Sequence, residues 1–186
     1  MRNINVKKMV GIAILMALIV ILQLLGQFIK FGPVSISLVL VPIVVGAAFY
    51  GPVAGAILGA TFSVVVLSQP DTAFFYSISV FGTIITVLVK GTLAGYICGL
   101  IYNLLSKYNT ILVVAISAAI CPIINTGIFF LGCRLFFWEG LAATGIENVA
   151  VYIVTFMIGI NFIAEFVVNI LCCPIIVRLL NAINKK

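Results

Sequence analysis

The sequence predicts an all-α integral membrane protein, a compact bundle of about six transmembrane helices with both termini in the cytoplasm. Of the 186 residues, 65% are hydrophobic and 8% are charged, and the mean hydropathy is +1.39. This balance lies far outside that of soluble domains. A bilayer core takes about 20 residues per helix, which leaves room for about six spans and short loops. We therefore expect one domain, residues 1–186, embedded in a lipid bilayer.

The first three apolar runs are expected to form a helix followed by a helical hairpin. The first, about Met9 to Ile29, has no small-residue cleavage site and is interpreted as a retained helix rather than a signal peptide. The second, about Val34 to Phe49, is short and contains Pro42, which predicts a tilted, kinked or incomplete crossing. The motif "YGP" then predicts a tight turn into a third run that ends near Ser68.

Three longer apolar runs follow. The polar segment "SQPDT" is interpreted as a loop, after which the fourth span covers about Ser77 to Leu105. The segment "SKYN" separates it from the fifth, about Thr110 to Phe137, and the sixth covers about Val149 to Leu180. Each run is long enough to cross a bilayer.

Basic residues predict the orientation, because short cytoplasmic loops collect Lys and Arg. With six spans and both ends inside, the cytoplasmic side carries Arg2, Lys7, Lys8, Lys107, Arg178, Lys185 and Lys186. The outer side carries the acidic Asp71, Glu139 and Glu147 together with Lys30 and Arg134. Topology thus accounts for the net charge of +6, and nothing in the sequence indicates nucleic-acid binding.

Polar residues inside the spans lie at one depth. The stretch "INFIAEFVVN" places Asn161, Glu165 and Asn169 four residues apart, on one face of a helix. Lys90, Asn125 and Asn161 each lie about 17 to 18 residues from a cytoplasmic basic flank, or about 26 Å, near the outer end of the core. Glu165 lies about one turn deeper. These positions predict a polar pocket that opens to the outside.

Structural roles are open for the same residues. Lys90 can pair with Glu165 or a backbone carbonyl, and Asn side chains can join helices by hydrogen bonds. Asn169 is deeper and is interpreted as structural. Intramembrane ionisable residues mark functional sites by default, so we favour ligand contact for Glu165 and Asn161, whereas a structural role is slightly favoured for Lys90. Arg134 can snorkel to the interface or hold an anionic ligand.

Aromatic residues cluster in two predicted outer loops, "SQPDTAFFYS" and "RLFFWEG". They form either an interfacial aromatic belt or a lid that stacks on a planar or amphipathic ligand. Phe75 and Trp138 are the candidate ligand contacts among them.

Several kinds of chemistry are excluded by missing residues. The chain has no His, which excludes a Ser-His-Asp triad, His-based proton relays and the common metal sites. It also lacks the Gly-rich loop of nucleotide-binding proteins. We therefore expect a binding or transport protein that is not an enzyme and has no metal or cofactor. Any ATP-driven step would need other subunits.

The whole chain resembles the substrate-binding S component of an energy-coupling factor (ECF) transporter, a vitamin-uptake class of ABC importer. The first helix carries "GIAILMA", in which Ala13 and Ala17 form an Ala-x-x-x-Ala motif. The "VPIVVGAAFYGPVAGAILGA" hairpin, the pair Lys90-Gly91 and the segment "NTGIFFLG" follow in the same order as in the family.

The resemblance implies a function and partners. Ala13 and Ala17 would face the transmembrane T subunit, which works with two ATP-binding subunits. A pocket around Lys90, Asn125 and the Asn161–Glu165 stripe would bind a water-soluble vitamin, with pantothenate ranked before riboflavin or a pterin. The S component would then topple and deliver the vitamin across a bacterial plasma membrane.

Two other hypotheses stay open from the residues. A proton-coupled secondary carrier would use Glu165 as its coupling carboxylate, although no internal repeat is evident. A non-transporting accessory protein would use the polar residues only to join helices.

Overall fold

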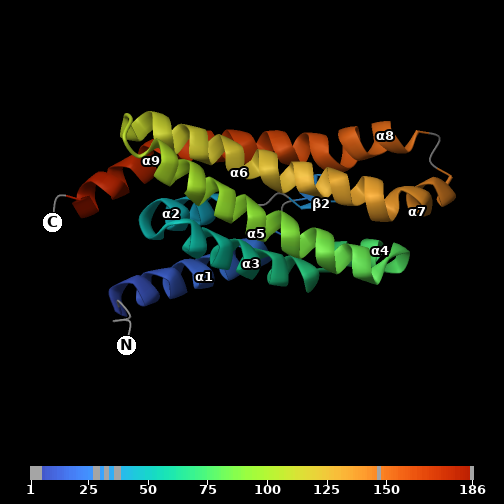
Figure 1. Cartoon of the computed structure of the whole chain (residues 1–186). Helices are drawn as coiled ribbons and strands as arrows, with labels where there is room; N and C mark the ends of the chain where they lie inside the picture. The colour runs from blue at the N-terminus through green and yellow to red at the C-terminus, as the bar shows by residue number, and fades with distance from the viewer. Residues whose placement is uncertain (1–5, 27–29, 32–33, 36–38, 146–147, 185–186) are drawn as a thin grey trace.

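The computed structural model of the chain describes residues 6–26, 30–31, 34–35, 39–145 and 148–184, some of them by their backbone alone. Its long helices run side by side, and α1 begins at the same end of the bundle at which α9 ends (Figure 1). The short helices α4, α7 and α8 gather at the other end (Figure 1). The predicted all-α membrane bundle is therefore confirmed. We call the end with α4, α7 and α8 the distal end.

Three helical stretches of the described chain are long and apolar enough to cross a bilayer: α1 (Val6–Gly26), α5 (Val80–Leu105) and Thr110–Ala143. The third stretch comprises α6 (Thr110–Gly132), the π-helix η1 (Cys133–Phe137) and α7 (Trp138–Ala143). After a short connection the chain returns along α6 as α8 (Val149–Tyr152), the π-helix η2 (Ile153–Gly159) and α9 (Ile160–Asn184).

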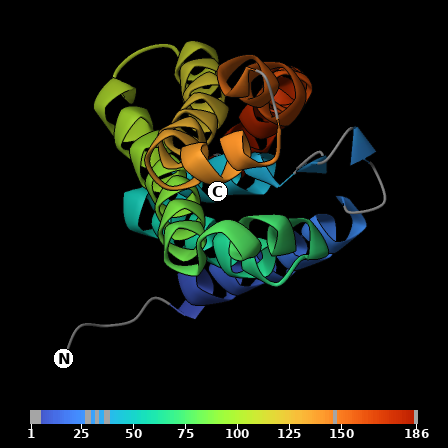
Figure 2. The same cartoon turned by 90° about the vertical axis from the view of Figure 1, so that its right-hand side faces the viewer.

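The short helix α2 (Leu40–Tyr50) lies in the middle of the bundle. It packs against α1, α3, α5, α6 and α9, as the end-on view shows (Figure 2). A helix that is apolar on every side is suited to such a buried position. The predicted helical start near Val34 was wrong, because Val34–Ser35 forms strand β2 and pairs antiparallel with β1 (Lys30–Phe31).

The "YGP" motif forms the tight turn that the sequence predicts. Gly51 has φ of +90°, a conformation that glycine adopts without steric cost. Pro52 then begins α3 (Pro52–Leu67), where its missing N–H needs no partner within the helix. The α2–α3 hairpin is thus determined by two neighbouring residues.

The predicted loop after Ser68 is instead the helix α4 (Pro70–Ile78), bent by 81° from α3. Pro70 occupies its first position and Asp71 its first turn, both of which favour a helix start. The sequence prediction was wrong because Pro was interpreted as a loop signal, whereas it also begins helices. Together α3 and α4 make either one broken span or a span followed by a cap.

Glycines set the closest helix pair, α3 against α5. Gly55 and Gly59 of α3 face Gly95 and Gly91 of α5, and a Cβ on any of them would collide with atoms of the facing helix. Ser63 continues this row and donates a 2.7 Å hydrogen bond from Oγ to the carbonyl of Val87. Small residues at four-residue spacing let membrane helices approach this closely.

Two clusters of buried apolar side chains fill the interior. The larger one joins α1, α2, α3, α5, α6 and α9 near the centre and the end at which α9 finishes. The smaller one lies at the distal end and consists of Cys133, Phe137, Leu141, Val149 and Ile153, with Phe75 and Phe129 packed against it. Buried polar residues on α5, α6 and α9 include Thr86, Asn125 and Glu165.

Candidate functional site

Lys90 projects from α5 into aromatic surroundings. Its ammonium nitrogen lies 4.9 Å from the centre of the Phe129 ring and 5.8 Å from that of Phe62. Cation–π contacts of this kind stabilise a cation that has left water. Lys90 also lies within electrostatic range of Glu165 on α9. A basic and an acidic side chain thus lie in the interior of one bundle.

Glu165 and Asn125 complete a polar region between α5, α6 and α9. Glu165 is 6% exposed and lies within electrostatic range of Cys121 on α6 as well as of Lys90. Asn125 is one turn from Cys121 and one turn from Phe129, on the same face of α6. Its buried Oδ1 atom has no hydrogen-bond partner within the described residues. Lys90, Asn125 and Glu165 therefore come from three helices to one region, which we call the polar site.

Phe75 of α4 covers the aromatic side of the polar site. Its ring centre is 5.6 Å from that of Phe129 and 5.1 Å from that of Phe137. Phe129 thus contacts the Lys90 ammonium on one side and Phe75 on the other. The α4 helix is a cap over the distal end of the bundle, and Phe75 is its contact with the polar site.

A pair of buried amides holds this cap to α1. Gln23 Nε2 donates to Gln69 Oε1 at 3.0 Å, and Gln69 Nε2 donates back to the Gln23 carbonyl at 3.1 Å. Gln69 directly precedes α4, and Thr72 Oγ1 and Tyr76 Oη donate to carbonyls at the end of α3. This pair was not predicted from the sequence. The feature that could have indicated it is the presence of two glutamines close to the ends of otherwise apolar runs.

Arg134 and Trp138 contact each other, one turn apart. The Arg134 guanidinium carbon lies 4.8 Å from the Trp138 ring centre, and Arg134 is exposed. Trp138 packs against the distal apolar cluster. The structure places both residues at the distal end and does not bring them into contact with Lys90.

The polar stripe on α9 is described only in part. The side chain of Asn161 lies outside the described residues, so its predicted position is untested. Asn169 Nδ2 donates to the Glu165 carbonyl at 3.0 Å, a bond within its own helix. Its Oδ1 atom has no hydrogen-bond partner within the described residues, so the structural role expected for Asn169 stays a prediction.

Two of the three helical stretches that border the polar site contain a π-helical segment. η1 begins at Cys133, one turn after Phe129, and η2 ends directly before α9. π-helical turns cost backbone hydrogen-bond geometry and occur frequently at functional sites. Neither segment was foreseen, because π-helices have no sequence signal comparable to a Pro or Gly.

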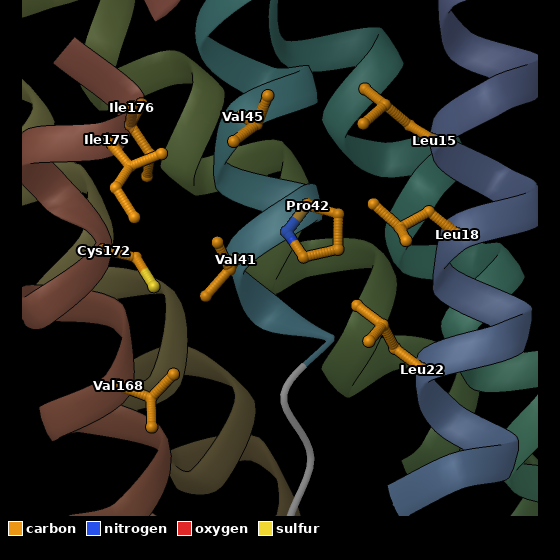
Figure 3. A pocket seen from close by; sticks show the side chains of 10 residues that line it. All are labelled: Leu15, Leu18, Leu22, Val41, Pro42, Val45, Val168, Cys172, Ile175 and Ile176. Carbon is orange, nitrogen blue, oxygen red and sulfur yellow. The ribbon is translucent and has the colours of Figure 1, made fainter. Parts of the chain in front are cut away.

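An apolar pocket of about 390 Å³ lies elsewhere, between α1, α2 and α9. Figure 3 shows Val41, Pro42 and Val45 of α2 between leucines of α1 and the side chains Val168, Cys172, Ile175 and Ile176 of α9. Its lining offers almost no polar atom, so it gives a water-soluble ligand nothing to bind by hydrogen bonds. The polar site remains the candidate.

Ala13 and Ala17 are both exposed on α1, one turn apart. Large neighbours on this helix, Ile14, Leu18 and Ile21 among them, are exposed as well. Few residues of α1 are buried in the bundle. The surface that carries the Ala-x-x-x-Ala motif is therefore accessible from the membrane.

Comparison with protein families decides the identity. The model of the family "ECF transporter, substrate-specific component" matches residues 7–177, nearly the whole chain. The chain belongs to this family. Neither the comparison with curated proteins nor that with solved structures found a match.

An ECF S component is a transport subunit and not an enzyme. It works as a multi-pass protein of the cell membrane, in association with ECF transmembrane and ATP-binding subunits, and takes a small-molecule substrate. Family membership also decides against the proton-coupled carrier and the accessory protein. The polar site is thus the candidate substrate-binding site of this S component.

Proposed function

We propose that this S component captures a water-soluble vitamin or a related small molecule with high affinity at the polar site. The observation that carries the proposal is the convergence of Lys90, Asn125 and Glu165 from three helices beneath Phe75 and Phe129. Intramembrane charges are costly and are rarely kept without a function. In this proposal residues 1–186 act as one domain.

The orientation follows from charge. If α1 starts and α9 ends on the cytoplasmic side, the basic residues next to these helix ends lie in the cytoplasm. This agrees with the enrichment of Lys and Arg in short cytoplasmic loops. The distal end then faces outward, so the polar site opens to the side from which a nutrient arrives.

The residues of the polar site suit a ligand with mixed polar groups. An ammonium group binds a carboxylate, an amide binds hydroxyl or amide groups, and Glu165 accepts hydrogen bonds. Pantothenate carries all of these and is narrowly favoured. Riboflavin or a pterin ranks next, because planar rings can stack on the aromatics around Phe75. Arg134, Trp138 and Asn161 are further candidate contacts on the outer side.

Delivery requires docking on the T subunit. The exposed Ala13 and Ala17 offer a surface on which another membrane helix can approach closely.

We expect Ala17→Trp to abolish ATP-driven uptake in vesicles with the complete transporter while vitamin binding is retained. Ile111→Trp, at another exposed position on α6, is the matched control and should transport normally.

A thermal-shift screen of the detergent-purified S component tests the binding function. A ligand that binds only the folded state raises the melting temperature, by an amount that grows with its concentration over Kd. We expect one vitamin of a panel of water-soluble vitamins to give a clear shift. If none shifts the transition at millimolar concentration, the vitamin assignment is wrong.

A further inference from the structure

Thr86 is a buried polar residue close to the polar site that the sequence analysis did not single out. It lies on α5 one turn before Lys90 and on the same face of the helix. Its side chain is 3% exposed. The Oγ1 atom has no hydrogen-bond partner in the part of the chain that the structure describes.

Two other hydroxyls near this part of α5 have partners, whereas the buried Ser117 hydroxyl on α6 has none among the described residues. Thr83, on the same helix, donates from Oγ1 to the Ser79 carbonyl at 2.7 Å, the usual bond of a helical Thr to the preceding turn. Ser63 donates across the helix interface to Val87. Thr86 makes neither kind of bond. Because a buried hydroxyl without a partner destabilises a protein, its position needs a reason.

The surroundings of Thr86 are those of Lys90. Gly132 of α6 packs directly against Thr86, so that a Cβ at Gly132 would collide with its side chain. The next residue, Cys133, lies within electrostatic range of the Lys90 ammonium. Asn125, about two turns earlier on α6, carries the other buried oxygen without a partner among the described residues on this part of α6.

We propose that Thr86 is a further substrate-contacting residue and that, with Asn125, it selects for ligands rich in hydrogen-bond donors. The Thr86 hydroxyl and the Asn125 carbonyl can each accept a bond from a ligand hydroxyl or amide N–H. Lys90 takes an acceptor or anionic group of the same ligand. This inference rests on the proposed function. It narrows the substrate class to molecules that combine hydroxyl or amide donors with an acceptor, and it disfavours simple aromatic or aliphatic carboxylates.

Equilibrium binding by calorimetry tests the proposal with pantothenate, riboflavin and nicotinate as probes. Nicotinate has a carboxylate but no hydroxyl or N–H donor, and we expect no measurable binding to the unmodified protein. For the probe that binds, Thr86→Val should weaken affinity about tenfold, because it removes the hydroxyl and keeps the shape. Thr86→Ser should retain affinity within about threefold. Thr83→Val, in which the lost hydroxyl bonds only to backbone, is the matched control and should bind normally.

The outcomes separate the two proposals. If a folded Thr86→Val variant binds the vitamin as tightly as the unmodified protein, Thr86 is not a contact, while the binding function stands. Tight binding of nicotinate overturns the donor-rich class. If the unmodified protein binds no vitamin, the proposed function fails, and this inference with it. If Thr86→Val does not fold, Thr86→Ala and Thr86→Ser replace it, and equal affinity of these two overturns the role of the hydroxyl.

Discussion

The two faces of α5 are built in opposite ways. Toward α3 it presents Gly91 and Gly95, whose backbones touch those of Gly59 and Gly55. Toward α6 and α9 it presents Thr86 and Lys90, large or polar side chains among aromatic rings. Lys90 and Gly91 are neighbours in sequence, yet a rotation of about 100° per residue turns Gly91 to the Gly59 backbone and Lys90 to Phe129 of α6, with Phe62 of α3 near both.

This difference separates the part of the molecule that holds the bundle together from the part that binds. The glycine interface is packed backbone to backbone and leaves no room for a ligand. On the other face, buried polar atoms without partners within the described chain, two π-helical segments and a separate cap helix leave the site adaptable. We therefore expect substitutions in the first region to prevent folding and those in the second to change binding in a folded protein.

The largest effect is expected for Gly95→Val. The added side chain would collide with the Gly55 carbonyl and with Ile43, so α3 and α5 would have to separate. Overpacking of this kind costs about 3 kcal/mol or more. We expect little folded protein after detergent extraction, measured by size-exclusion profile and thermal unfolding.

Gly127→Val is the matched control, because a Cβ at Gly127 meets nothing within 4 Å. Its thermal transition should stay close to that of the unmodified protein. Equal tolerance of the two substitutions would show that the glycine interface does not hold the bundle.

An intermediate effect is expected for Glu165→Gln. The substitution keeps the shape but removes the negative charge that interacts with Lys90. A hydrogen bond to a charged group contributes about 1.5–3 kcal/mol, so the affinity of the vitamin should fall about 10- to 100-fold. Calorimetric titration measures this, and circular dichroism should report an intact helical fold.

Asn169→Leu is the control on the same stripe, since Asn169 bonds to its own helix. We expect normal affinity for this variant. A Glu165→Gln protein that binds the vitamin normally would remove Glu165 from the site.

The smallest effect is expected for Gln69→Leu, which removes both hydrogen bonds between α1 and the cap. Each neutral hydrogen bond contributes about 1 kcal/mol. Bound vitamin should therefore dissociate about three- to tenfold faster, as a displacement assay would measure, because α4 and Phe75 open more readily. Gln23→Leu removes only the bond to Gln69 Oε1, because Gln69 Nε2 donates to the backbone carbonyl of residue 23, so its effect should be smaller; the double variant should not exceed Gln69→Leu. Additive effects would mean that the two glutamines act separately.

Much of the fold could be predicted from the sequence, but the direction in which each helix turns its side chains could not; the depth of the site stays a prediction. Helix runs and the turn at Gly51 followed from local apolarity and from "YGP". Counting residues along the helices placed Lys90 near the level of Glu165 and left its partner open, and the structure puts the two within electrostatic range. Gln23, Gln69 and Thr86 were missed, because each is a single polar residue whose importance depends on what faces it.

By itself, the sequence determined that this chain is a membrane-embedded helical protein, and it predicted a common level for several of its polar groups. The apolar composition places the chain in a lipid bilayer. The constant rise per residue of a helix then converts a residue number into an expected depth in that bilayer. Only the tertiary structure decided that α4 is a helix and a cap, that glycines join α3 to α5, and which side chains enclose Lys90. Those features depend on contacts between residues far apart in the chain, and such contacts are settled when the helices pack together.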